Sequence, residues 1–474
     1  MEQRNDEFCE TRFLLHLLNG IFPCQKRIEA QKALPLRQNY LAMIKKITLL
    51  FVVALTLNIA AFSQNKNPKT GIVNIADSVQ MYQTFLDNAP VEPEFMMVPR
   101  FAIVDTKGHF YFSTGARLNF MASFDWGNPI TNPTDAGSDL LMPATPGNTR
   151  LFQMSAGESL LYFNIIGFPN TKNQIGLFVS LGMDKDSDNS YRIFANQVYM
   201  RYRGFQCGYA TSLYNDRGAD AYTIDGHGPC ASGAHKAVQI NYQHNIDNWG
   251  FGVGVELPQV SYTQMLLDST IDVPSKTAKT FQRIPDVPLY ASYTWENSSH
   301  IRLSAVFRDI TYYNVVKEAN NHVLGWGVKL SGSVHLGPVQ IFAMTQGGHA
   351  ISNYMKDNRN TGIDLVPGKG ESPDYLERTY SYGGVLGVQV DLTSAVFMTG
   401  SCSYMQNEVP EYEVPATINY QDHVRGALNA SANVVWRISR IFSTGVEYVH
   451  VRNQKISGDK LYDNRVYAMF MMNF

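Results

Sequence analysis

The final stretch of the chain, residues 461–474, alternates apolar and polar positions with a period of two. One face carries Val466, Phe470 and Phe474, and Arg465 lies on the other. A strand that alternates in this way, is too short for a membrane helix and ends on phenylalanine is typical of the last strand of an outer-membrane β-barrel. Phe470 and Phe474 are therefore the predicted closing signal, which the barrel-insertion machinery would read. An ordinary half-buried strand is the alternative.

The same alternation recurs upstream, and the lengths of the connections follow a pattern of their own. Alternating stretches lie at 109–125, 175–183, 249–257, 301–307, 324–330, 382–392 and 428–436, while 151–165 and 191–202 alternate less cleanly. Long connections at 126–150, 214–235, 259–285, 351–377 and 407–421 are separated by tight turns at 247–248, 297–299, 337–338, 393–394 and 439–440. Outer-membrane barrels sort their connections in this way, and a soluble β-sandwich has no reason to do so. The sequence predicts an all-β fold, a transmembrane antiparallel β-barrel of about 16 strands over 109–474.

A secretory signal peptide precedes the predicted barrel. Residues 43–63 combine a basic start, an apolar run and small residues before a cleavage point predicted after Ser63. The run is shorter than the roughly 20 residues that a spanning helix needs. We interpret 1–42 as an over-extended N-terminus. Within 64–108, helical spacing over 79–86 predicts a short helix in a periplasmic or lumen segment, with a disordered leader as the alternative.

Composition mainly excludes function classes. The chain is 45% hydrophobic and 17% charged with a formal net charge of -2, so nucleic acid is not an expected partner. Mean hydropathy is low because lipid-facing and lumen-facing residues alternate in such barrels. Cys207, Cys230 and Cys402 are widely spaced and form neither a disulfide framework nor a metal motif. We therefore expect no metal and no cofactor.

A barrel of this size leaves an aqueous channel, which makes passive transport of small solutes the expected function. The charged residues predicted to line the pore are Arg117, Glu256, Arg302, Arg308, Lys329, Arg425, Glu447 and Arg465. The connection between the fifth and sixth strands is predicted to fold inward and to place Asp216, Arg217, Asp220, Asp225 and His227 at a constriction, with an exposed Gly-rich loop as the alternative. Basic groups predominate on the inward faces, which favours anions and carboxylates in particular.

Two other function classes compete with a porin. An outer-membrane hydrolase is disfavoured because no nucleophile motif such as G-x-S-x-G is present, so we expect no enzyme. A structural or adhesive barrel would have a lumen packed with side chains.

Four stretches also resemble one family of channels. TIDGHGP at 223–229, VGVELP at 253–258, TQGGHAISNYMKD at 345–357 and GVEYVHVRNQKISG with NRVYAMFMMNF at the end are similar to the DcaP-like porins, in the form found in Bacteroidota. The resemblance implies a homotrimer in the outer membrane of a Gram-negative bacterium, in contact with its lipid, that passes small anionic solutes including dicarboxylates. His227 lies where the family often has an acidic residue, which affects the solute preference.

Overall fold

The computed structural model describes residues 71–474 except 106, 137–146, 148, 186–189, 234, 263–281, 315–318, 360, 368–375 and 410–422. The predicted signal peptide at 43–63 and the segment 1–42 lie outside the described residues. None of the described helices is long and apolar enough to cross a membrane.

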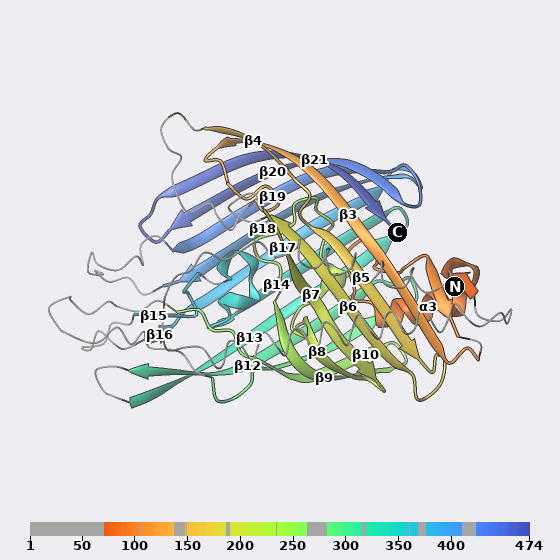
Figure 1. Ribbon diagram of the computed structural model, residues 1–474. Helices are drawn as coiled ribbons and strands as arrows, with labels where there is room; N and C mark the ends of the chain where they lie inside the picture. The colour runs from red at the N-terminus through yellow and green to blue at the C-terminus, as the bar shows by residue number, and fades with distance from the viewer. Residues whose placement is uncertain are drawn as a thin grey trace, which may run out of the picture. The chain divides into compact units, whose positions relative to one another are not determined.

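Sixteen antiparallel strands close into a barrel, which confirms the predicted fold class (Figure 1). Each wall strand pairs with the next one along the chain, β4 and β5 together form the second wall strand, and β21 pairs with β3 to complete the ring. The wall strands are β3 (Phe110–Gly127), β4 (Arg150–Ser155), β5 (Ser159–Gly167), β6 (Ile175–Lys185), β7 (Tyr191–Tyr202), β8 (Phe205–Thr211), β9 (Lys236–Ile246), β10 (Trp249–Glu256), β11 (Val287–Thr294), β12 (His300–Asn314), β13 (Ala319–Leu336), β14 (Val339–His349), β17 (Tyr380–Asp391), β18 (Val396–Glu408), β19 (Val424–Arg437), β20 (Phe442–Lys455) and β21 (Lys460–Asn473).

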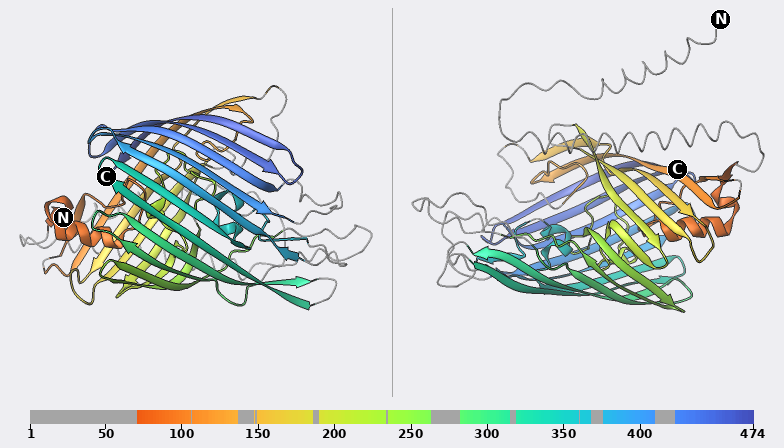
Figure 2. Two further views of the ribbon diagram at one scale, coloured as in Figure 1. Left: turned by 180° about the vertical axis from the view of Figure 1, so that it is seen from behind. Right: turned by 60° about the horizontal axis from the view of Figure 1, so that its bottom comes forward.

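The period-two pattern places apolar side chains on the outside of the wall and polar ones inside. On β3, Phe120 and Phe124 are exposed on the outer face, whereas Asn119 and Ser123 are buried inside. This arrangement is the inverse of a soluble protein, because the solvent of the outer face is lipid. The wall strands run obliquely, as the view from behind shows (Figure 2), and such a tilt is required to close a sheet into a barrel.

The two stretches that alternate less cleanly in sequence are irregular in the structure. The second wall strand is interrupted by residues 156–158, between the end of β4 and the start of β5. In the fourth, the pairing of β6 with β7 shifts between Ser180 and Leu181, so that Asn196 is an additional residue. A bulge moves the following side chains out of phase with those before it, which explains the broken pattern.

Short turns and the C-terminus lie at one end of the barrel, and the long connections leave from the other (Figure 1). Ile246 pairs with Trp249 and Leu336 with Val339, so the predicted turns at 247–248 and 337–338 each have two residues. Gly337 has φ +62°, a left-handed conformation that glycine adopts without strain.

The N-terminal part of the described chain docks at the short-turn end. The ribbon formed by β1 (Gly71–Asn74) and β2 (Phe101–Val104) extends the wall by pairing with β3. Helix α3 (Val79–Asn88) confirms the predicted helix; its N-cap Ser78 accepts from the backbone N–H of Met81. Phe85 of α3 packs in a buried cluster with Ile75, Ala102 and Ile166.

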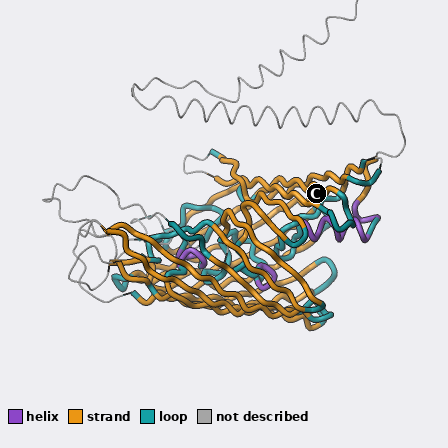
Figure 3. The backbone as a smooth tube through the Cα atoms, turned by 90° about the horizontal axis from the view of Figure 1, so that it is seen from below, coloured by secondary structure: helices purple, strands orange, loops and turns teal. Residues whose placement is uncertain are grey.

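Short elements lie in the connections. They are η1 (Ile75–Asp77), η2 (Arg217–Ala219), η3 (Ser352–Tyr354), η4 (Lys356–Asn358), β15 (Leu365–Pro367) and β16 (Leu376–Arg378). In the view from below, loop segments and short helical turns are visible within the strand wall (Figure 3). The interior is therefore occupied by chain, and the functional question is what space and which charges remain there.

Candidate functional site

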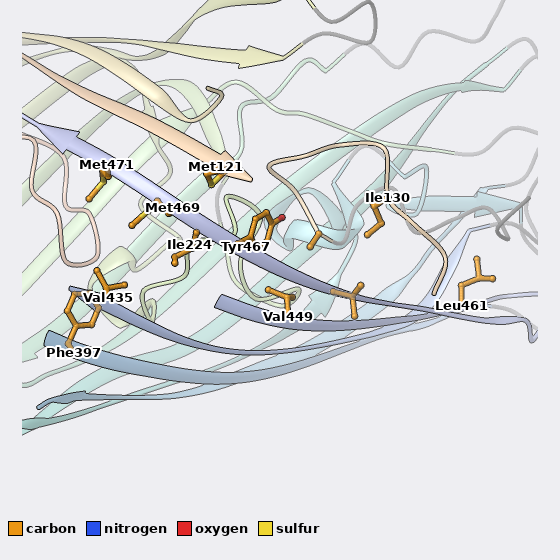
Figure 4. Close-up of a cluster of buried hydrophobic side chains, with 12 residues drawn as sticks. Met121, Ile130, Ile224, Phe397, Val435, Val449, Leu461, Tyr467, Met469 and Met471 are labelled. Carbon is orange, nitrogen blue, oxygen red and sulfur yellow. The ribbon is translucent and has the colours of Figure 1, made fainter. Parts of the chain in front are cut away.

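The connection 212–235, between β8 and β9, lies inside the barrel. Tyr214, Asp225 and Cys230 are buried. On the opposite wall, Glu447 of β20 accepts from the backbone N–H groups of Ile224 (2.5 Å) and Asp225 (3.3 Å), and the Cys230 N–H donates to the Ser403 hydroxyl of β18 at 2.8 Å. Ile224 packs among side chains of the wall strands, including Val435 and Met469 (Figure 4). We call 212–235 the inward loop; its role as a constriction stays a prediction.

A second connection, 350–365, also enters the interior. Its Tyr354 is buried and donates through its hydroxyl to Glu256 of β10. Arg308 of β12 donates to the carbonyl of Ala350 and forms ion pairs with Asp286 (2.9 Å) and Asp364 (3.3 Å). The sequence placed this connection among the long loops without predicting that it turns inward, because it has no hydrophobic period.

The third inward segment is residues 89–99, which we call the N-terminal strap. Glu92 of the strap pairs with Arg217 of the inward loop at 3.1 Å, and Glu94 pairs with Arg437 of β19. The rings of Phe95 and Tyr222 meet edge to face, with their centroids 5.3 Å apart. The strap therefore runs from helix α3 into the barrel and contacts the inward loop.

Most of the charges predicted to line the pore hold these segments in place. Glu256, Arg308 and Glu447 bind the inward segments as described above. Lys329 lies over the ring of Tyr214, its nitrogen 5.0 Å from the centroid. Arg465 forms an ion pair with Asp125 on β3. Arg425 is half-buried on β19.

Arg117 and Arg302 differ from that group because both also line interior cavities. Arg117 donates to the carbonyl of Phe95 at 2.5 Å. Arg302 donates to the carbonyl of Leu213 and lies 3.6 Å from the centroid of the Tyr290 ring. Each guanidinium retains donors that are not used by these bonds.

The predicted constriction residues of the inward loop are ion-paired or hydrogen-bonded. Asp216 contacts His300 at 2.9 Å and accepts from Ser331 at 2.7 Å. Burial raises the pKa of Asp216, but the hydrogen bond with His300 and the charge of Arg302 outweigh burial and hold that pKa well below its usual range. Asp220 pairs with Arg217.

His227 and Asp225 link the inward loop to its neighbours. Asp225 accepts from the backbone N–H of Ala136 at 3.0 Å. His227 lies between Asp135, at 3.1 Å, and Asp357 of the connection 350–365. Burial lowers the pKa of His227, but the two carboxylates outweigh it and raise that pKa well above its usual value. His227 therefore joins three connections through its contacts with two carboxylates.

Three cavities adjoin one another inside the wall. The rim cavity, of about 700 Å³, lies at the short-turn end between α3 and residues such as Arg201 and Arg203. The middle cavity, of about 260 Å³, shares Arg201 with it and adds Arg217 and Arg302. The charged cavity, of about 510 Å³, shares Arg217 with the middle one. Because the middle cavity shares a lining residue with each of the other two, it lies between the rim cavity and the charged cavity.

The charged cavity contains basic residues that the sequence did not single out. Lys236, Lys356 and Arg359 line it together with Arg117. The Lys236 ammonium donates to the side-chain oxygen of Asn196, and the Lys356 ammonium donates to the carbonyl of His227. Within the described ranges, Arg117, Lys236, Lys356 and Arg359 form no ion pair. The sequence signal of Lys236, Lys356 and Arg359 is weak, since each is a single basic residue at a strand start or in a connection.

Comparison with known proteins supports the architecture. No protein-family model and no curated protein matches the chain. Among solved structures, the outer membrane channel DcaP of Acinetobacter baumannii is 14% identical with a TM-score of 0.64, over 78% of this chain and 98% of that one. An anion-selective porin from Comamonas acidovorans is 9% identical with a TM-score of 0.49, over 77% of this chain and 100% of that one. Membership of the DcaP-like family stays a prediction; the likeness to DcaP shows that the chain has the fold of an outer-membrane porin.

Proposed function

We propose that the protein is an outer-membrane porin of a Gram-negative bacterium that gives passive diffusion to small, carboxylate-bearing anions. The observation that carries the proposal is the charged cavity, where Arg117, Lys236, Lys356 and Arg359 line one space without an ion-pair partner in the described chain. The described hydrogen bonds of Arg117, Lys236 and Lys356 go to neutral acceptors, so these groups are able to bind a carboxylate. A structural barrel has no use for such a cluster, since burying unpaired charge opposes folding.

The strength of these contacts suits permeation. A charge-assisted hydrogen bond contributes about 1.5 to 3 kcal/mol, so two of them supply roughly the 4 kcal/mol of a millimolar site. Tighter binding would trap the solute, whereas weak successive sites raise its local concentration and still release it. Arg302 in the middle cavity and Arg201 in the rim cavity extend the series toward the short-turn end.

Reversal potentials in planar lipid bilayers under a salt gradient test the proposal. The unmodified protein is expected to be anion-selective, and the triple variant Arg117→Gln, Lys236→Gln, Lys356→Gln is expected to shift toward cation preference and to lose block by succinate. The matched control is Arg452→Gln, because Arg452 is exposed and lies outside these cavities. Cation selectivity of the unmodified protein would contradict the proposal and show that the carboxylates of the inward loop dominate. The homotrimer implied by the resemblance stays a prediction, which mass determination in detergent would test.

A further inference from the structure

Glu158 lies on the charged cavity at the interruption of the second wall strand. Its backbone has φ +62°, a left-handed conformation that is uncommon for residues other than glycine, asparagine and aspartate. The Glu158 N–H donates to the carbonyl of Met183 on the neighbouring strand at 3.0 Å, which fixes the break. Its side chain is exposed and contributes to the lining of the charged cavity. The interruption thus turns a carboxylate into the interior at a point where a regular strand would continue.

This carboxylate is available to a ligand. Glu158 forms no ion pair with any residue that the structure describes. Asp184 and Asp135 are close enough to act on it with like charge, and Lys236 with opposite charge. Asp135 is already engaged by His227, and Asp184 pairs with the exposed Arg192 at 3.4 Å. Glu158 and Asp184 therefore form an acidic side of the cavity that has no buried ion-pair partner among the described residues.

The basic side belongs to the same space. Arg117, Lys236 and Lys356 line the cavity together with Glu158 and Asp184. The ammonium groups of both lysines donate to neutral oxygens, and within the described chain neither forms an ion pair with Glu158 or Asp184. A solute in this cavity therefore meets positive and negative groups at once. A site that binds anions alone would not include exposed carboxylates, because they repel the solute.

From this juxtaposition we infer a binding site for small zwitterions of the amino-acid class, with the solute carboxylate on the lysines and Arg117 and the solute ammonium on Glu158. The inference rests on the proposed channel function and adds to its solutes the carboxylates that also carry an ammonium group. The volume of about 510 Å³ lies in the range of small-molecule sites. A metal ion is a poor alternative, because no group of three His, Cys, Asp or Glu in the described residues is placed to hold one.

Current block by γ-aminobutyrate and by succinate tests the inference, since the two four-carbon solutes differ in having an ammonium or a carboxylate at one end. Glu158→Gln is expected to weaken block by γ-aminobutyrate about tenfold, the loss of one charge-assisted hydrogen bond, and to leave succinate unchanged or more tightly bound. Asp184→Asn is expected to act in the same direction with a smaller effect. Glu296→Gln is the control, because Glu296 is exposed at a short turn.

The outcomes separate this inference from the proposed function. Block of the unmodified channel by succinate with an unchanged ratio of the two solutes in Glu158→Gln would overturn the zwitterion site and retain the anion channel. Failure of both solutes to block the unmodified protein would overturn both. Lys236→Gln with Lys356→Gln is expected to weaken both solutes together, and heat-modifiable electrophoretic mobility confirms that each variant is a folded barrel.

Discussion

Arg465 shows how far a single residue can be interpreted from its place in a pattern. Alternation assigns it to the inward face of β21, and the structure buries it there. Its guanidinium is fully engaged, because it donates to Asp125, to the carbonyl of Ile130 at 2.8 Å and to the hydroxyl of Tyr467 at 2.9 Å. The period of a strand gives the face of a residue but not its partners, and two of these, Asp125 and Ile130, lie more than 300 positions away in the sequence.

We expect Arg465→Ser to destabilise the barrel by about 3 to 5 kcal/mol, because Asp125 would remain as a buried charge without its partner. The measurement is equilibrium unfolding in urea, followed by tryptophan fluorescence. The double variant Arg465→Met, Asp125→Asn removes both charges and is expected to be less destabilised than the single one. An unchanged unfolding midpoint in Arg465→Ser would mean that Arg465 is free to line a pore, as its position in the sequence alone predicts.

His227 makes the anchoring of the inward loop depend on pH. Its folded pKa is raised above the unfolded value of 6.5, so its contribution is fully present below about pH 6.5 and is lost as pH rises through the folded pKa. The groups that face it are Asp135, Asp357, Asp225 and the Lys356 ammonium. We expect current fluctuations to increase on the alkaline side, and the increase to be absent in His227→Gln. Fluctuations that grow only in acid would contradict this assignment.

At the scale of elements, the sequence predicts regular strands well and their interruptions poorly. The strand predicted over 109–125 is β3, whose faces are those of the alternation. Residues 156–158 and Asn196 disturb the alternation, but the sequence alone does not show that the first form a break in the strand and the second a β-bulge. The N-terminal strap and the connection 350–365 have no period at all, and their positions depend on contacts with distant strands. The cavity-lining residues Lys236 and Lys356 were missed because the first lies at the start of a strand and the second in a connection.

The N-terminal strap is expected to reduce the conductance of the channel. It occupies the interior and is fixed to the inward loop by the Glu92–Arg217 ion pair and the Phe95–Tyr222 contact. Glu92→Gln combined with Phe95→Ala should loosen its contact with the inward loop and raise the single-channel conductance, which is measured in planar bilayers. Val79→Ala is the control, because Val79 is 87% exposed on the preceding helix. Equal conductance in the double variant and the control would show that the strap does not limit the current.

At the scale of the whole molecule, closure and the apolar outer surface are two parts of one requirement. No backbone group of a sheet edge can be left unpaired in hydrocarbon, so the first and last wall strands must meet. They do so along β3 and β21, and Ala116 and Phe474 exchange backbone hydrogen bonds of 2.7 and 2.9 Å at the end of the seam. Phe470 is 56% exposed on the outer face of β21, where a closing signal would be accessible.

The outer face of β17 offers a test of where the membrane lies. Leu386 is 58% exposed and lies five residues from Asp391, where β17 ends at the short-turn side. For a strand tilted by about 40°, five residues span about 13 Å along the membrane normal, which is about half the height of an apolar band of about 25 Å. Leu386→Arg is therefore expected to destabilise the inserted barrel by about 2 to 4 kcal/mol, measured by folding into lipid vesicles at increasing urea.

Tyr382 is the matched control for that substitution, since it lies on the same face and strand, four residues farther from the short-turn end. An arginine there reaches the opposite interface, where the cost falls to about 0 to 1 kcal/mol, and the tyrosine it replaces is a residue type typical of such interfaces. A larger effect of Tyr382→Arg than of Leu386→Arg would place the centre of the membrane nearer the long connections.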